Sequence, residues 1–96
     1  MKNFKTINQV RNSIDKIDSK LLELIYKRKL LVEEAVRLKK KNQIVDKKRI
    51  QEILNELDSE SQKKNLPEGL IVKIWKTMIN GFIKYERDIY DKVHKK

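Results

Sequence analysis

One long helix is the feature that most constrains how this chain folds. Residues 5–40 contain no proline or glycine, and their apolar residues recur at steps that mostly alternate between three and four. This spacing is typical of a helix with one packed apolar face. The face comprises Ile7, Val10, Ile14, Ile17, Leu21, Leu24, Leu31, Ala35 and Leu38. We therefore predict a first helix of about 35 residues.

Such a helix is too long for a compact chain of this size. At about 1.5 Å per residue it would extend roughly 50 Å. A compact chain of 96 residues has a radius of gyration of only roughly 12–13 Å. The apolar face therefore needs a partner beyond its own chain, and the sequence predicts a homodimer.

Two shorter helices are expected after the first, which gives an all-α, three-helix chain with one domain over residues 1–96. Asp46 suits the N-cap of the second helix, and Pro67 suits the first turn of the third. The third helix carries Ile71, Ile74, Trp75, Met78, Phe82, Tyr85 and Ile89 at helical spacing. Gly81 lies inside that helix, where it would permit close approach of another helix or a ligand.

The composition argues against several classes of site. The chain has no cysteine, and its single histidine is His94, so we expect no metal and no cofactor. No stretch is long and apolar enough to span a membrane, and the N-terminus lacks the apolar core of a secretory signal. We therefore expect a cytoplasmic protein. The formal net charge of +10 indicates either a solvated lysine-rich surface or an anionic partner.

Two charged residues occupy positions where the pattern asks for an apolar one. Arg28 takes a position of the apolar face, between Leu24 and Leu31. Burying an unpaired guanidinium is costly, so Arg28 needs either an internal carboxylate or an anionic ligand. Glu86 interrupts an otherwise apolar column at seven-residue spacing. Its carboxyl group is expected either to pair with a lysine or to stay protonated and donate a hydrogen bond.

Two further cations lie beside the same face of the first helix. Arg11 stands between Val10 and Ile14, and Lys39 follows Ala35 by four residues. Alone, each would be interpreted as a solvated side chain at the edge of the face. Together with Arg28 they form a file of cations along one helix, which favours a ligand that carries carboxylate or phosphate groups. A reaction that needs only shape and fixed positive charge would fit this set of residues.

These residues resemble the all-helical chorismate mutase family over nearly the whole chain. The resemblance rests on Arg11 followed by Ile17-Asp18, on the apolar helix that ends in Lys27-Arg28, on Lys39, and on Asp46-Lys47-Lys48-Arg49. It implies an intertwined dimer of three-helix chains with two equivalent sites. It also implies a cofactor-free pericyclic rearrangement of chorismate to prephenate.

The resemblance assigns roles to individual residues. Arg28 would bind one substrate carboxylate, and Arg11 of the other subunit would reach the second. Lys39 would contact the ether oxygen and a carboxylate, with Arg49 supporting the carboxylate end and Asp46 near the ring hydroxyl. Glu86 stands where the family places a glutamine or glutamate that hydrogen-bonds the ether oxygen, and for that role it must be neutral.

The sequence departs from the usual pattern of the mutases at two positions, and these departures keep other functions open. Ile50 stands where the mutases usually carry a glutamate, and Phe82 stands where a small polar residue is common. Large apolar residues there resemble the isochorismate pyruvate lyases, which share the fold and form salicylate and pyruvate. A 4-amino analogue of chorismate is another candidate substrate, and loss of catalysis in favour of a regulatory role is a further alternative.

A basic, non-enzymatic helical module that binds nucleic acid is the alternative from a different class. It would present the cations as a continuous outer stripe and bind in a strongly salt-dependent way. The sequence shows no motif for recognition of a groove, and its few aromatic residues lie mainly at core spacing. We therefore expect no nucleic-acid partner and no membrane partner.

Overall fold

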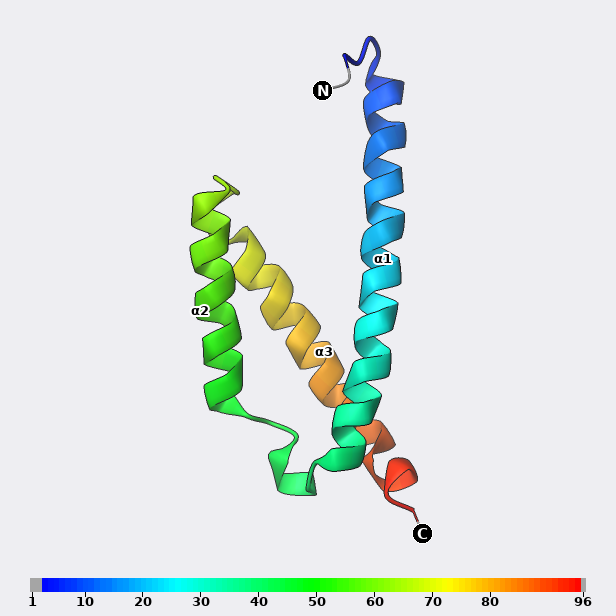
Figure 1. Ribbon diagram of the computed structural model, residues 1–96, viewed down its shortest axis with the longest axis vertical. Helices are drawn as coiled ribbons and strands as arrows, with labels where there is room; N and C mark the ends of the chain where they lie inside the picture. Colours follow the sequence, from blue (N-terminus) through cyan, green and yellow to red (C-terminus); the bar gives the residue numbers. More distant parts are fainter. Residues whose placement is uncertain (1–2, 96) are drawn as a thin grey trace. The chain divides into compact units, whose positions relative to one another are not determined.

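The computed structural model describes residues 3–95, which are helical with no strand (Figure 1). Helix α1 spans Ile7–Leu38, α2 spans Lys47–Lys63 and α3 spans Leu70–Val93. A short 3-10 helix, η1, spans Lys41–Gln43 in the connection between α1 and α2. The predicted all-α, three-helix chain is confirmed. None of the helices in the described part of the chain is long and apolar enough to cross a membrane.

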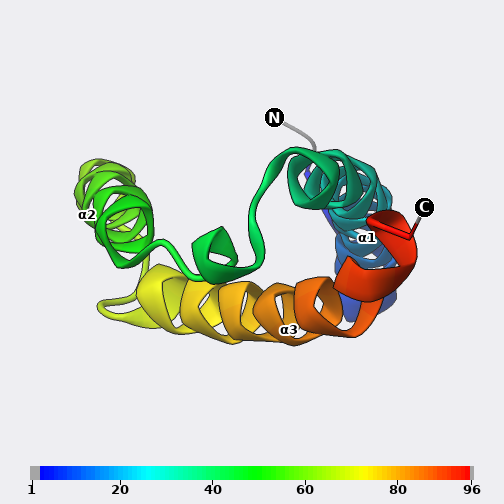
Figure 2. The same ribbon diagram turned by 90° about the horizontal axis from the view of Figure 1, so that it is seen from below.

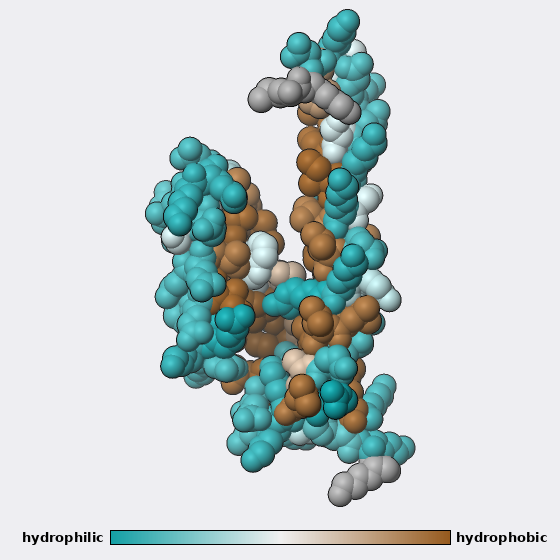
Figure 3. Space-filling model, viewed as in Figure 1, coloured by the Kyte–Doolittle hydropathy of each residue, from teal (hydrophilic) through white to brown (hydrophobic). Residues whose placement is uncertain are grey.

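Helix α1 runs without interruption through the stretch that the sequence predicts to be helical. The chain divides into two compact units, one ending at Leu31 and the other beginning at Val32, so α1 contributes to both. In the first unit the apolar face of α1 is open to solvent, as the brown side chains along that helix indicate (Figure 3). Ile7, Ile14, Ile17, Leu21, Leu24 and Leu31 are between 49% and 70% exposed.

The second unit contains the last turns of α1, then η1, α2 and α3. Helix α2 packs on α3, and it lies beside the first half of that helix in both ribbon views (Figures 1 and 2). Asp46 caps α2, because its Oδ1 accepts a hydrogen bond of 3.0 Å from the amide of Arg49. This contact confirms the predicted start of the second helix and satisfies one of its free amides.

The buried side chains of the described residues all belong to the second unit. The apolar ones are Val36, Ile44, Leu54 and Ile79, of which only Val36 is fully buried. Ser61 and Glu86 are buried polar residues. A core of this size is small for a folded domain, and it lies around the end of α1 and along the contact of α2 with α3.

The third helix begins later than the sequence predicts. Pro67 precedes it by one turn, and the N-cap is Gly69 with a φ of 77°. That left-handed conformation is one that glycine adopts without strain, and it separates Pro67 from the helix. The amide of Leu70 donates instead to the carbonyl of Pro67 at 3.2 Å, which closes a turn before α3.

Candidate functional site

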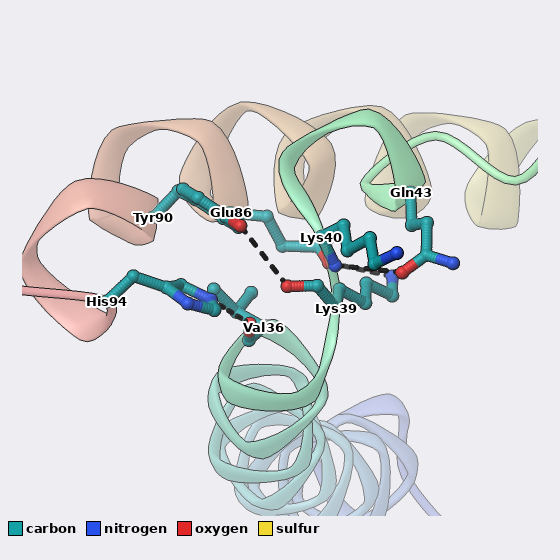
Figure 4. A network of polar contacts seen from close by, with 7 residues as sticks. All are labelled: Val36, Lys39, Lys40, Gln43, Glu86, Tyr90 and His94. Carbon is teal, nitrogen blue, oxygen red and sulfur yellow. Dashed lines mark hydrogen bonds and ion pairs between the residues drawn. The ribbon is translucent and has the colours of Figure 1, made fainter.

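Lys39 and Glu86, two of the residues predicted for the site, form a salt bridge. Lys39 directly follows α1, and Glu86 lies in the second half of α3. The Lys39 Nζ donates to Glu86 Oε1 at 3.0 Å, and the Lys39 and Glu86 side chains are 31% and 8% exposed (Figure 4). Both residues belong to the second unit.

This pairing explains why Glu86 interrupts an apolar column. A carboxylate with so little contact with water needs a charged or hydrogen-bonding partner. The ammonium group of Lys39 supplies that partner from a segment 47 residues away in the sequence. Of the two interpretations open from the sequence, the salt bridge to a lysine is the arrangement that the structure contains.

A pocket of about 620 Å³ lies beside Lys39 in the connection between α1 and α2. It is lined by Lys39, Asn42, Gln43, Val45, Asp46 and Lys47. Two hydrogen bonds close the turn that shapes this pocket. The Lys40 amide donates to Gln43 Oε1 at 2.8 Å, and the Gln43 amide donates to the Lys40 carbonyl at 2.9 Å. The charged residues of the lining are Lys39, Asp46 and Lys47, and the ammonium group of Lys39 is paired with Glu86.

The start of α2 supplies the next predicted residues. Asp46 lines the pocket and caps the helix at the same time. Arg49 is exposed in the first turn of α2, where its backbone amide serves the cap. Ile50 is half-buried. The structure thus brings Asp46 together with Lys39 around one pocket, and it places Arg49 and Ile50 immediately beside Asp46 on α2.

Phe82 lies on α3 one turn before Glu86 and is half-buried. Between them, the Tyr85 hydroxyl donates to the carboxylate of Glu33, which joins α3 to α1 near its end. Phe82 and Glu86 share a side of α3, since residues four apart on a helix are neighbours. Phe82 therefore belongs to the same part of α3 as the Lys39–Glu86 pair.

Arg11 and Arg28 belong to the first unit and lie on α1. Arg11 is exposed, and Arg28 is half-buried. They are 17 residues apart on one uninterrupted helix, which corresponds to about 25 Å along its axis. A ligand of the size of a small dicarboxylate therefore cannot contact both arginines of one copy.

Two residues that sequence reasoning missed meet the end of α1. The Tyr90 hydroxyl donates to the Lys39 carbonyl at 3.3 Å, and His94 Nε2 lies 2.7 Å from the Val36 carbonyl (Figure 4). Both follow Glu86 at four-residue steps, Tyr90 on α3 and His94 at the C-cap of that helix. That spacing is the signal that could have linked them to Glu86, because residues at such steps share one face of a helix.

The described residues offer no evident metal centre. Within residues 3–95, no group of three or more histidine, cysteine, aspartate or glutamate side chains lies close enough to hold an ion. The chemistry that this arrangement can perform is anion binding by lysine and arginine, together with hydrogen bonding between Lys39 and Glu86.

Comparison with known proteins identifies the family. No curated protein and no solved structure gives a match to this sequence. The family model described as chorismate mutase type II matches residues 10–87, a stretch that includes every residue predicted for the site. Because this match covers most of the chain, the protein belongs to the all-helical chorismate mutase family.

Proposed function

We propose that the protein is a chorismate mutase, which rearranges chorismate to prephenate without a cofactor. Family membership supports this class of reaction. The observation that carries the proposal is the Lys39–Glu86 pair, whose 3.0 Å contact lies beside a polar pocket lined by Lys39, Asp46 and Lys47. An ammonium donor next to a carboxyl group is a suitable pair for an ether oxygen that gains charge.

The rearrangement separates charge as its ether bond breaks, and negative charge grows on the ether oxygen. Fixed donors aimed at that oxygen lower the barrier because they stabilise the transition state more than the ground state. We assign this role to Lys39. Arginine side chains that bind the two substrate carboxylates through paired hydrogen bonds would restrict the flexible enolpyruvyl arm to a reactive conformation.

Glu86 needs a proton to act as a second donor to the ether oxygen. In the protein without ligand its carboxyl group accepts a hydrogen bond from Lys39. A substrate carboxylate would compete with Glu86 for the same ammonium group. We therefore expect substrate binding to separate Lys39 from Glu86.

The remaining residues would bind the carboxylates and the ring hydroxyl. We assign Arg28 to one carboxylate, Arg49 to its support and Asp46 to the ring hydroxyl. Arg11 would serve the site of the other copy. The separation of about 25 Å between Arg11 and Arg28 along α1 supports this assignment, because one small substrate cannot span it.

A second copy of the chain also accounts for the apolar face of α1. Large apolar side chains are exposed along this face in the first unit. An extended apolar stripe on one helix is characteristic of a helix that packs on another. We propose an intertwined homodimer in which the two α1 helices bury these faces and each supplies Arg11 to the site of its partner.

Incubation of the purified protein with chorismate, at mildly acidic and at neutral pH, tests the proposal. NMR of the products is expected to show prephenate. Arg28→Ala should abolish conversion while the protein remains a folded dimer. Lys27→Ala is the matched control, since Lys27 is an exposed neighbour and its loss should leave conversion unchanged. Near-full turnover by Arg28→Ala would refute the assignment of the site.

An isochorismate pyruvate lyase is the second candidate, favoured by Ile50 and Phe82. Both side chains are half-buried and apolar, one beside Asp46 and the other one turn before Glu86. Incubation with isochorismate distinguishes the two activities, because a lyase would release salicylate and pyruvate. Formation of these products without prephenate from chorismate would replace the mutase proposal and make Ile50 and Phe82 the determinants of the reaction.

A further inference from the structure

One face of α3 holds the end of α1 at several points. Glu86, Tyr90 and His94 follow one another at four-residue steps, and all three contact residues 36–39. Figure 4 shows their side chains extending from α3 toward Val36 and Lys39. The side chain of Lys39 is bound by Glu86 and its backbone carbonyl by Tyr90, so one helix face fixes both ends of this residue.

The end of a helix needs such partners. The last four carbonyls of an α-helix lack intrahelical amides and must find other donors. At the end of α1 the Lys39 amide reaches the carbonyls of Ala35 at 3.0 Å and Val36 at 3.3 Å. His94 Nε2 lies closer to the Val36 carbonyl, at 2.7 Å. Because a carbonyl can only accept, this contact requires a hydrogen on Nε2, and His94, the C-cap residue of α3, is then a cap for α1.

Tyr90 and His94 also support each other. Their rings are stacked, with centroids 4.1 Å apart and an angle of 21° between the planes. Stacking restricts both rings to the orientation in which the hydroxyl reaches Lys39 and the imidazole reaches Val36. Val36 is the one fully buried side chain among the described residues. The cap therefore acts on the turn of α1 that is best anchored in the core.

We propose that Tyr90 and His94 are positioning residues that fix Lys39 for its role as a donor. The inference rests on the proposed function, in which Lys39 touches the substrate. Lys39 lies just beyond the last residue of α1, where a helix without a cap frays. Without Tyr90 and His94, its backbone is free to move and its ammonium group leaves the position that Glu86 defines.

Four variants test the inference. His94→Ala removes the cap, and His94→Gln is the rescue variant because its amide nitrogen is also a donor. Tyr90→Phe keeps the stacked ring and removes only the hydroxyl. Lys92→Ala is the matched control, since Lys92 is exposed and lies off this face of α3.

Amide hydrogen exchange at Lys39 provides a readout that does not depend on activity. The Lys39 amide is bonded within the last turn of α1, so its exchange reports fraying of that turn. His94→Ala should accelerate this exchange by about fivefold, the effect of losing one hydrogen bond of ordinary strength. His94→Gln should restore most of the protection, and Lys92→Ala should leave the exchange unchanged. Unchanged exchange in His94→Ala overturns the inference, whatever the protein does with chorismate.

Turnover of chorismate tests the consequence for catalysis. A displacement of about 1 Å at a reacting group can cost up to about 100-fold in rate. We expect His94→Ala and Tyr90→Phe to lower kcat by about tenfold while KM changes less. In a Lys39→Gln background the same changes should cost no further activity, because they act through Lys39. An equal loss of kcat in both backgrounds overturns the positioning role. If the unaltered protein forms no prephenate, the proposed function is refuted instead. The exchange measurement then tests only whether His94 caps α1.

Discussion

Shortening one leucine on the apolar face of α1 should weaken the proposed dimer. Leu24 lies near the middle of this face and is 58% exposed in the single chain. Full burial of a leucine side chain contributes about 1.5–3 kcal/mol. Somewhat more than half of that gain is still available to Leu24, which is about 1 kcal/mol for each copy.

The change enters the dissociation constant twice, because each copy carries the substitution. Leu24→Ala should therefore destabilise the dimer by about 2 kcal/mol and raise its dissociation constant about 30-fold. Leu30→Ala is the matched control. Leu30 is 43% exposed, and its position six residues further along α1 places it about 120° around the helix from Leu24, off the apolar face. The same loss of atoms there should change dimerisation little.

Sedimentation equilibrium over a range of concentrations would measure these constants. The unfolding temperature offers a second measure, since a dimer that unfolds to monomers becomes more heat-stable as its concentration rises. Two results would refute the reasoning. One is an unaltered protein that sediments as a monomer throughout the range. The other is a dimer that weakens more with Leu30→Ala than with Leu24→Ala. That result would mean that the dimer interface lies on a different side of α1.

Four further predictions concern the second unit. Lys39→Ala should lower the free energy of unfolding by about 2–3 kcal/mol in urea titrations, because it leaves the Glu86 carboxylate buried without its charge partner. Glu86→Gln should cost less stability than Lys39→Ala in the same titrations, because the neutral amide oxygen can still accept a hydrogen bond from Lys39, and an equal or larger loss would refute this. Asp46→Ala should destabilise the protein by about 1 kcal/mol, because the N-cap of α2 is lost. Asp46→Asn should keep this stability, so a loss of chorismate turnover in that variant would report the role of Asp46 toward substrate. Gly81→Ala should raise stability by about 1 kcal/mol, since a Cβ there meets no atom within 4 Å; a loss of stability would mean that another chain lies against this position.

The sequence predicts the helices well, because the apolar residues of an amphipathic helix recur at steps of three and four. The alternation of steps of three and four predicts a helix over residues 5–40, and α1 spans Ile7–Leu38. Asp46 is an N-cap in the structure as in the prediction, since a short acceptor side chain before an amphipathic stretch is a local signal. The start of α3 was wrong by one turn. Two local signals competed there, and the left-handed Gly69 determined the boundary rather than Pro67.

The site was less predictable, because its contacts join segments that are far apart in the sequence. The charge of Glu86 in an apolar column shows that it needs a partner, but it cannot single out Lys39 from the other lysines of a chain with 24 lysines and arginines. Tyr90 and His94 left no signal as strong. Each of these side chains bonds a backbone carbonyl that is distant in the sequence, and neither residue interrupts an apolar pattern. Only their four-residue spacing from Glu86 connects them to the site.

The two units hold different parts of the machinery proposed here. Lys39, Glu86 and the pocket beside Asp46 come from the second unit, where salt bridge, helix cap and buried side chains already hold them in one chain. Arg11 and Arg28 come from α1 of the first unit, whose apolar face is exposed. In the proposed mutase, the donor to the ether oxygen would depend on contacts within one chain, whereas the carboxylate clamp would depend on a second chain, because about 25 Å of helix separates the two arginines. Dimerisation and substrate binding would therefore be linked through Arg11, and the long first helix would serve both the assembly and the site.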